Sequence, residues 1–239
     1  MNIHTVKLGH IALASSLYIG GCVSQPPTIA HTHIGHAMTG WADTPSKQGL
    51  FVTAENTAQD ALQAAVIAAD NSNDLAGIKT DVVHVINATN SDNKQDGGDK
   101  TGAQYGVYNA LTGAVNHITF AANSPDVSDN IKNSTKTFSM HAQVVLDRCD
   151  LILALGGEIH ATSSQSEASI LAGELLKLTD ANVNGEDLDG DGVAGSIPAE
   201  YGLKQLRTQL QVMIDREIPP YRTVDTWYLF NLVRQPNGD

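Results

Sequence analysis

Apolar residues recur at intervals of three and four along most of the chain, and short polar clusters separate the segments that carry this pattern. Such spacing places apolar side chains on one face of an α-helix. Alternation with a period of two, which indicates β-strands, is nearly absent. We therefore expect helices over residues 54–69, 74–88, 104–122, 134–160 and 164–179, and a last one between Pro198 and Pro219.

Local signals mark several helix ends. Ser164 and Glu167 fit a capping box, in which the serine hydroxyl and the glutamate satisfy free backbone N–H groups. Pro198 suits a first helical turn, whereas Pro219 and Pro220 forbid continuation of a helix. Because short connections favour antiparallel neighbours, the pattern predicts an all-α, up-and-down bundle of about five or six helices.

This bundle should form one domain over residues 51–218. Residues 22–50 are expected to form an extended N-terminal segment, whose first part, with paired prolines, suits a tether. We expect residues 219–239 to form a C-terminal tail outside the bundle. The polar and acidic loop at 184–200 joins the last two predicted helices.

Residues 1–21 have the layout of a signal peptide: Lys7 precedes a small and apolar stretch that ends in Ile19-Gly-Gly-Cys22. The stretch is too short to cross a bilayer, which takes roughly 20 apolar helical residues. Its last four residues resemble the lipobox of bacterial lipoproteins. That resemblance implies cleavage before Cys22 and acylation of its thiol. An ordinary secretory signal is the alternative, and both interpretations export the chain.

A lipid anchor at Cys22 would place the protein in the cell envelope, as an outer-membrane lipoprotein that faces the periplasm or the cell surface. Cys149 would then be the only thiol, so no intramolecular disulfide could form. It shares the apolar stripe of its predicted helix, which favours a buried structural thiol over a nucleophile.

The formal net charge of −12 makes nucleic acid an unsuitable partner. An acidic surface favours cations instead, although acidity is also a common aid to solubility. Metal ions, the membrane and a protein partner are the expected partners.

Three aspartates at alternate positions, Asp187, Asp189 and Asp191, are followed by Gly192. Calcium prefers six to eight oxygen ligands, which a tight loop can supply from alternate side chains. The segment resembles the calcium loops of EF-hands and related DxDxDG proteins. The resemblance implies that Val193 contributes its carbonyl oxygen.

The second half of the loop departs from the EF-hand pattern, because Pro198 occupies the place of the bidentate glutamate. Glu200 is the nearest replacement, and Glu186 is an alternative. A bound Ca²⁺ would fix the junction of the last two helices, which is a structural role. The competing interpretation is a solvated acidic turn.

Nine histidines occur in the chain, and two of them lie in the predicted signal peptide. Neutral imidazole is a common ligand for zinc, copper and iron. The remaining seven are candidate ligands for a transition metal or for haem: His31, His33, His36, His84, His117, His141 and His160.

The first three of these are close in sequence. His33 and His36 share a face if the segment is helical, and His31 and His33 do so if it is extended. The others fall one by one on predicted helices, and bundles often build metal sites from facing helices. Trp41 is expected to anchor this segment over the bundle, which would bring the trio to the core. For any one helical histidine, a role as an ordinary core or surface residue is the alternative.

No CxxCH motif is present, which excludes covalent c-type haem, although non-covalent haem with two histidine ligands stays open. No HExxH, GxSxG, phosphate-binding loop or dinucleotide motif occurs, and the Gly156-Gly157 pair lies in a helical pattern without the required strand.

We therefore expect an exported, lipid-anchored protein that binds metal ions, for metal delivery or electron transfer. The alternative is a calcium-stabilised structural or partner-binding lipoprotein without catalytic activity. A third hypothesis is a histidine-dependent metalloenzyme. Clustered histidines with an open coordination position would favour the third, whereas dispersed and solvent-facing histidines would favour the second.

Overall fold

The computed structural model describes residues 28–90 and 105–221. Within these ranges the chain forms α-helices, two single-turn 3-10 helices and no strand, which confirms the predicted all-α bundle. The α-helices are α1 (Ile29–Met38), α2 (Leu50–Asp70), α3 (Leu75–Thr89), α4 (Val107–Ala122), α5 (Asp129–Ala161), α6 (Gln165–Asn184) and α7 (Leu203–Asp215). The 3-10 helices are η1 (Pro45–Lys47) and η3 (Pro198–Glu200).

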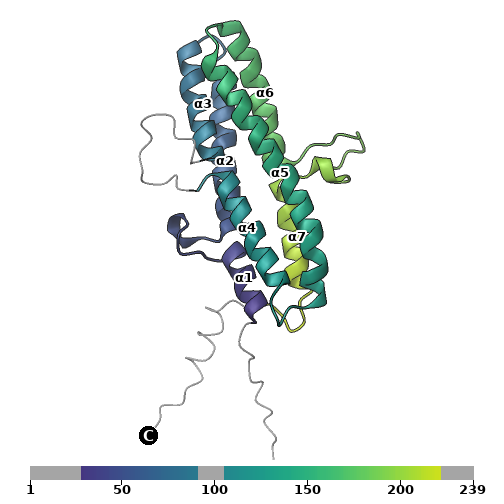
Figure 1. Cartoon of the computed structure of the whole chain (residues 1–239). Coiled ribbons are helices and arrows are strands. Elements are labelled where there is room, and N and C mark those ends of the chain that lie inside the picture. The colour runs from purple at the N-terminus through teal and green to yellow at the C-terminus, as the bar shows by residue number, and fades with distance from the viewer. Residues whose placement is uncertain (1–27, 91–104, 222–239) are drawn as a thin grey trace, which may run out of the picture.

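The helices form an elongated bundle with two successive hydrophobic cores, and α2 and α5 run through both (Figure 1). With 33 residues, α5 is about 50 Å long. One core lies between these two helices and α3 and α6. The other lies between them and α1, α4 and α7. Thus each long helix is faced by shorter helices that follow one another along the bundle.

The first helix differs from the expectation, because residues 29–38 are helical instead of extended. Ten residues are too few for a stable isolated helix, so tertiary contacts decide its formation. Ala30, Ile34 and Ala37 are fully buried on its inner face. At its start, the Asp126 carboxylate accepts hydrogen bonds from the backbone N–H groups of Ile29 (2.6 Å) and Ala30 (3.1 Å).

The region around the acidic loop also differs from the expectation. The sixth helix continues to Asn184, beyond the predicted end near Thr179, and the last helix does not begin at Pro198. Pro198 instead opens the separate turn η3, and α7 begins after Gly202. A Cβ atom at Gly202 would lie 2.4 Å from the backbone nitrogen of Gly185, so the two chain segments cross too closely for any other residue.

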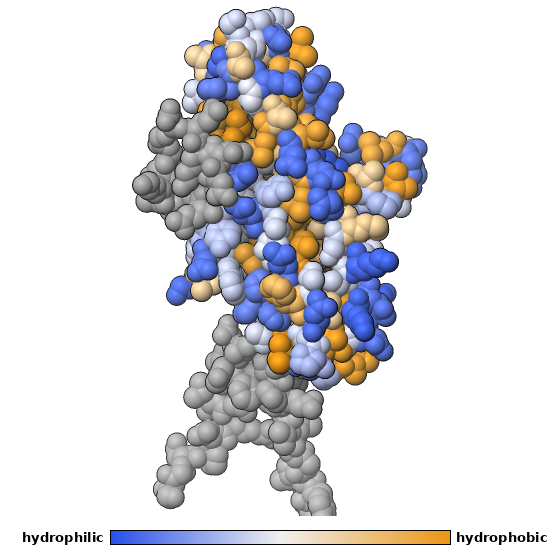
Figure 2. Space-filling model, viewed as in Figure 1, coloured by the Kyte–Doolittle hydropathy of each residue, from blue (hydrophilic) through white to orange (hydrophobic). Residues whose placement is uncertain are grey.

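Hydrophilic residues cover much of the face seen in Figure 2, with hydrophobic ones between them. Within the described ranges, no helix combines the length and the hydrophobicity needed to span a membrane. The predicted signal peptide, Cys22, the beginning of the tether and most of the predicted tail lie outside those ranges, so these stay predictions.

Candidate metal centres

Two helices bring three histidines together at one end of the bundle. On α1, His33 and His36 lie one turn apart, and both face His117 of α4. The Nδ1 atom of His117 lies 3.2 Å from that of His33 and 3.4 Å from that of His36. One ligand nitrogen from each of the three lies within 4.8 Å of the others. We call this group the histidine cluster.

The spacing of these nitrogens suits a single ion. Zinc binds histidine nitrogens at about 2.0–2.1 Å, so two nitrogens on one tetrahedral zinc stand about 3.4 Å apart. The two measured separations are close to that value. Small adjustments of side-chain torsions would therefore be enough to close the site around an ion.

Two aromatic side chains flank the histidine cluster. The ring centre of Trp41 lies 4.8 Å from that of His36 and 4.6 Å from that of His117. The ring centre of Phe120 lies 5.5 Å from that of His33 and 5.6 Å from that of His117. Trp41 also packs against the core near α1, so it anchors the N-terminal segment over the bundle as expected. It does not bring the whole histidine trio to the core, because only His31 is buried and His33 and His36 are half-buried.

The environment favours the neutral form of two members of the cluster, His36 and His117. Burial, together with the proximity of His36 and His33, lowers the pKa of His117 to about 4. Burial, followed by the proximity of His33, also lowers the pKa of His36. Because metal ions bind the neutral imidazole, protons do not compete strongly with a metal at these two residues at neutral pH.

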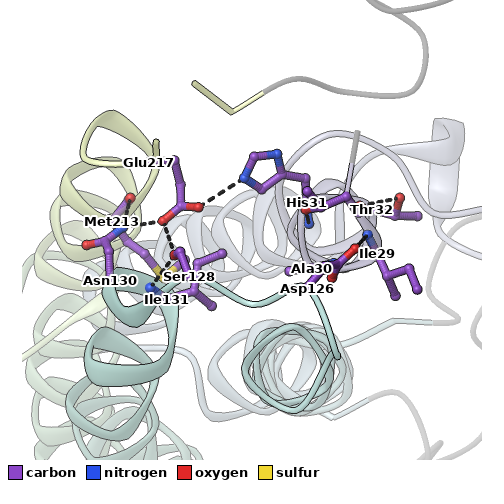
Figure 3. A network of polar contacts seen from close by, with 11 residues as sticks. Ile29, Ala30, His31, Thr32, Asp126, Ser128, Asn130, Ile131, Met213 and Glu217 are labelled. Atoms are coloured by element: carbon purple, nitrogen blue, oxygen red, sulfur yellow. Dashed lines mark hydrogen bonds and ion pairs between the residues drawn. The ribbon is translucent and has the colours of Figure 1, made fainter. Parts of the chain in front are cut away.

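The third member of the predicted trio, His31, points away from the cluster. Its Nε2 atom lies 3.0 Å from Oε2 of Glu217, and both side chains are buried (Figure 3). Glu217 also accepts hydrogen bonds from Ser128 Oγ (2.6 Å) and Asn130 Nδ2 (2.5 Å). This network joins α1 to the start of α5 and the chain after α7, so His31 holds the helix that carries two of the candidate ligands.

The other helical histidines do not join the cluster. His84 and His160 are exposed. His141 is buried, with its Nδ1 2.7 Å from Nε2 of Gln209 and its ring centre 3.8 Å from that of Tyr201.

Cys149 is a buried free cysteine, in agreement with a structural thiol. Burial raises the pKa of its thiol to about 12, which disfavours the reactive thiolate. Its sulfur accepts a hydrogen bond from Asn182 Nδ2 at 3.2 Å.

The acidic loop between α6 and η3 brings a second group of candidate ligands together. It projects from the side of the bundle beside α5 (Figure 1). Carboxylate oxygens of Asp187, Asp189 and Glu200 lie within 4.8 Å of one another. Asp187 accepts hydrogen bonds from the backbone N–H groups of Gly190 (2.7 Å) and Gly192 (2.8 Å), which hold the loop in a tight turn.

Glu200 is the buried centre of this loop, with no exposed surface. Its Oε1 accepts hydrogen bonds from the backbone of Leu188 (2.8 Å) and Asp189 (3.2 Å). Its Oε2 accepts others from Gly195 and Ser196, each at 2.9 Å. Burial alone would raise the pKa of Glu200, but the hydrogen bonds outweigh it and lower the pKa to about 2.

The remaining predicted calcium ligands lie at the surface of the loop. Asp191 is exposed, and its Oδ1 accepts a hydrogen bond from the backbone of Val193 at 2.8 Å. The side chain of Val193 is exposed as well. Of the predicted calcium residues, the structure therefore groups Asp187, Asp189 and Glu200.

Arg148 of α5, which sequence reasoning did not single out, holds the base of the loop. Its buried guanidinium donates hydrogen bonds to the carbonyl oxygens of Ala181 (3.1 Å), Tyr201 (3.0 Å) and Ala199 (3.2 Å). Burial lowers the pKa of this group. The ends of α6 and η3 are thus tied to the core helix, whatever the loop binds.

Comparisons with protein-family models, with curated proteins and with solved structures found no match for this chain.

Proposed function

We propose that the protein binds one divalent transition-metal ion, Zn²⁺ or Cu²⁺, between His33, His36 and His117. The observation that carries this proposal is the spacing of the Nδ1 atoms, 3.2 and 3.4 Å, across two helices that are far apart in the sequence. Two neutral rings can come this close by sharing a proton. A single shared proton does not account for three rings whose nitrogens converge, whereas one metal ion bound by all three does.

The donor set favours a transition metal over calcium or magnesium, because imidazole nitrogens suit zinc, copper, iron and nickel, whereas hard cations prefer oxygen. It also favours a single ion over haem. A haem iron with two histidine ligands requires the macrocycle to lie between the two rings. In this structure the rings of His33 and His36 both contact that of His117, and Trp41 and Phe120 pack beside them.

The cellular role that we propose is metal binding and delivery in the cell envelope. It rests on the predicted lipid anchor at Cys22, with the tether that follows it leading directly into α1. A copper or iron ion in the cluster would permit electron transfer, which is the alternative role.

The test is a titration of untagged, metal-free protein with Zn²⁺ and Cu²⁺, followed by calorimetry and elemental analysis. We expect one tightly bound ion per chain and an increase in thermal stability, since a ligand at 100 times its Kd stabilises by about 2.7 kcal/mol. His33→Ala and His117→Ala should each weaken binding at least tenfold. His84→Ala and His160→Ala are matched controls, because both side chains are exposed and lie outside the cluster.

Equal metal affinity in the cluster variants and in the controls would contradict this proposal. The calcium-stabilised or partner-binding lipoprotein would then be the better hypothesis.

A second proposal concerns the acidic loop, which we infer to bind Ca²⁺. What favours it is the position of Glu200, which follows the expected glutamate position by two residues and nevertheless reaches Asp187 and Asp189. The role is structural, because an ion there would neutralise carboxylates at the junction of α6 and α7.

Calcium analysis of the Asp187→Asn and Asp189→Asn double variant tests this second proposal. We expect the variant to lose a stoichiometric Ca²⁺ that the parent retains. Asp150→Asn, an exposed change on α5, is the control. Glu186→Gln asks whether that residue is also a ligand. If Ca²⁺ leaves the melting temperature of the parent unchanged, the loop is a solvated acidic turn.

A further inference from the structure

The histidine cluster offers only part of a coordination shell. Within residues 28–90 and 105–221, no fourth histidine, cysteine or carboxylate joins the three imidazoles. Two carboxylates near α1 are engaged elsewhere: Asp126 caps the start of the helix, and Glu217 contacts His31. Zinc takes four ligands in proteins, and sites with three protein ligands keep a position for an external one.

The two aromatic neighbours cannot fill this position. The indole of Trp41 has an N–H that only donates, and the phenyl ring of Phe120 has no lone pair. Both rings lie beside the imidazoles, at angles of 60° (Trp41) and 86° (Phe120) to the ring of His117. All three histidines are only partly buried, and Phe120 is 51% exposed, so the centre is at the surface of the bundle.

These surroundings select the chemistry of the external ligand. Two aromatic neighbours favour a flat ring as the incoming ligand, because aromatic rings attract one another in stacked and edge-to-face arrangements beyond the effect of the area that they bury. The chain carries a net charge of −12, which repels free anions such as azide as they approach the protein. A neutral aromatic nitrogen donor satisfies both conditions.

We propose, on the basis of the metal centre proposed above, that the bound ion takes its fourth ligand from outside the chain, and that this ligand is the imidazole of a histidine side chain. The incoming imidazole enters between Trp41 and Phe120 and displaces a water molecule from the ion. Since such a ligand can come from a partner protein, the same step gives the ion a route by which it is received or handed over.

The experiment uses the Co²⁺-loaded protein, whose visible spectrum reports the number and type of ligands. Free imidazole, the peptide Gly-His-Gly, the peptide Gly-Ala-Gly and azide are titrated separately, and bound cobalt is measured after each titration. We expect saturable, one-to-one spectral changes with imidazole and with Gly-His-Gly, at concentrations below those that azide requires. The peptide without histidine should give no change.

Two variants of Phe120 test the position of the entry site. Phe120→Ala removes one aromatic wall and should weaken the binding of imidazole to the cobalt-loaded protein about two- to tenfold. Phe120→His places a fourth imidazole beside His117 and His33, and should abolish the response to added imidazole. Leu151→Ala, which removes an exposed apolar side chain of α5, is the control and should respond as the parent does.

The outcomes separate this inference from the metal centre on which it rests. If cobalt does not bind, or binds equally well without His117, the metal centre itself is wrong and the inference is lost with it. If cobalt binds through the cluster but imidazole causes no spectral change, removes the metal, or binds more weakly than azide, only the external histidine ligand is wrong.

Discussion

The Nδ1 atoms of His33 and His117 lie 3.2 Å apart although 84 positions separate the two residues in the chain. At this distance one ring can donate a hydrogen bond to the other only if the accepting nitrogen is unprotonated. Two charged rings would repel each other. The contact therefore couples protonation of the cluster to the docking of α1 on α4.

This coupling predicts a loss of stability in mild acid for the metal-free protein. The pKa of His117 is lowered to about 4 from its usual 6.5. Between these pH values the unfolded chain binds more protons at this residue than the folded chain does, so the free energy of unfolding falls as the pH falls from 6.5 to 4. Urea unfolding at pH 7.5 and pH 5 should show this decrease.

His117→Asn should lose part of the pH dependence, whereas His84→Asn, at an exposed position, should keep it. An identical decrease in both variants would show that the cluster does not contribute to acid sensitivity.

The buried contact between His31 and Glu217 should contribute strongly to the free energy that holds α1 on the bundle. Removing one partner of a buried hydrogen bond costs about 1–3 kcal/mol, because the other group stays buried without its partner. We therefore expect Glu217→Ala, which also removes an acceptor from Ser128 and Asn130, to lower the free energy of unfolding by roughly 3 kcal/mol, and to speed hydrogen exchange along α1 (Figure 3).

A double-mutant cycle with His31→Ala isolates the pair from the other hydrogen bonds of Glu217, which come from Ser128 and Asn130. Strictly additive effects of the two substitutions would mean that the contact between His31 and Glu217 adds nothing to stability.

Glu200 should make the stability of the protein depend on pH in a more acidic range than His117 does. Its pKa is lowered to about 2 from 4.5. The stability that its ionised form contributes is therefore present above pH 4.5 and lost as the pH falls towards 2. Glu200→Gln should unfold at a lower temperature than the parent at pH 7 in the presence of a calcium chelator, and the difference should shrink between pH 4.5 and 2.

Asp191→Asn is the matched change in the same loop, because its side chain is exposed. It should have little effect at any pH in the absence of calcium. A melting temperature of Glu200→Gln equal to that of the parent at pH 7 would refute a central role for this carboxylate.

The adjacent glycines of α5 should respond in opposite directions to substitution by alanine. A Cβ atom at Gly156 would lie 2.8 Å from Cγ1 of Ile86 on α3, whereas one at Gly157 would meet nothing within 4 Å. Gly156→Ala should destabilise by about 1–3 kcal/mol through overpacking. Gly157→Ala should stabilise by up to about 1 kcal/mol, because alanine favours a helix. Thermal unfolding measures both, and equal effects would contradict the close packing of α3 on α5.

The sequence by itself determined the helices whose apolar stripes are long. The segments expected at 74–88 and 104–122 correspond closely to α3 and α4, because periodic apolar positions and polar breaks are local properties. Ser164 caps α6 by accepting a hydrogen bond from the backbone of Glu167 at 3.3 Å, as the local motif indicates. The other half of the predicted capping box does not form, because the Glu167 carboxylate accepts a hydrogen bond from the Thr162 hydroxyl and the backbone N–H of Ser164 donates to Thr162. Part of each group of candidate ligands was also visible locally, as the close spacing of His33 and His36 and the alternate positions of Asp187 and Asp189.

Only the tertiary structure decided which candidates meet. The short first helix depends on burial of Ile34 and on the distant Asp126 and Glu217, which no local pattern reveals. Two residues are about 200° apart around a helix, so His31 and His33 lie on opposite sides of α1. Once α1 docks on α4, His33 therefore contacts His117, whereas His31 contacts Glu217. In the same way, the turn that begins at Pro198 places the carboxylate of Glu200 within 4.8 Å of those of Asp187 and Asp189. Spacing along the chain fixes which side chains share a face, but the packing of distant helices fixes what that face contacts.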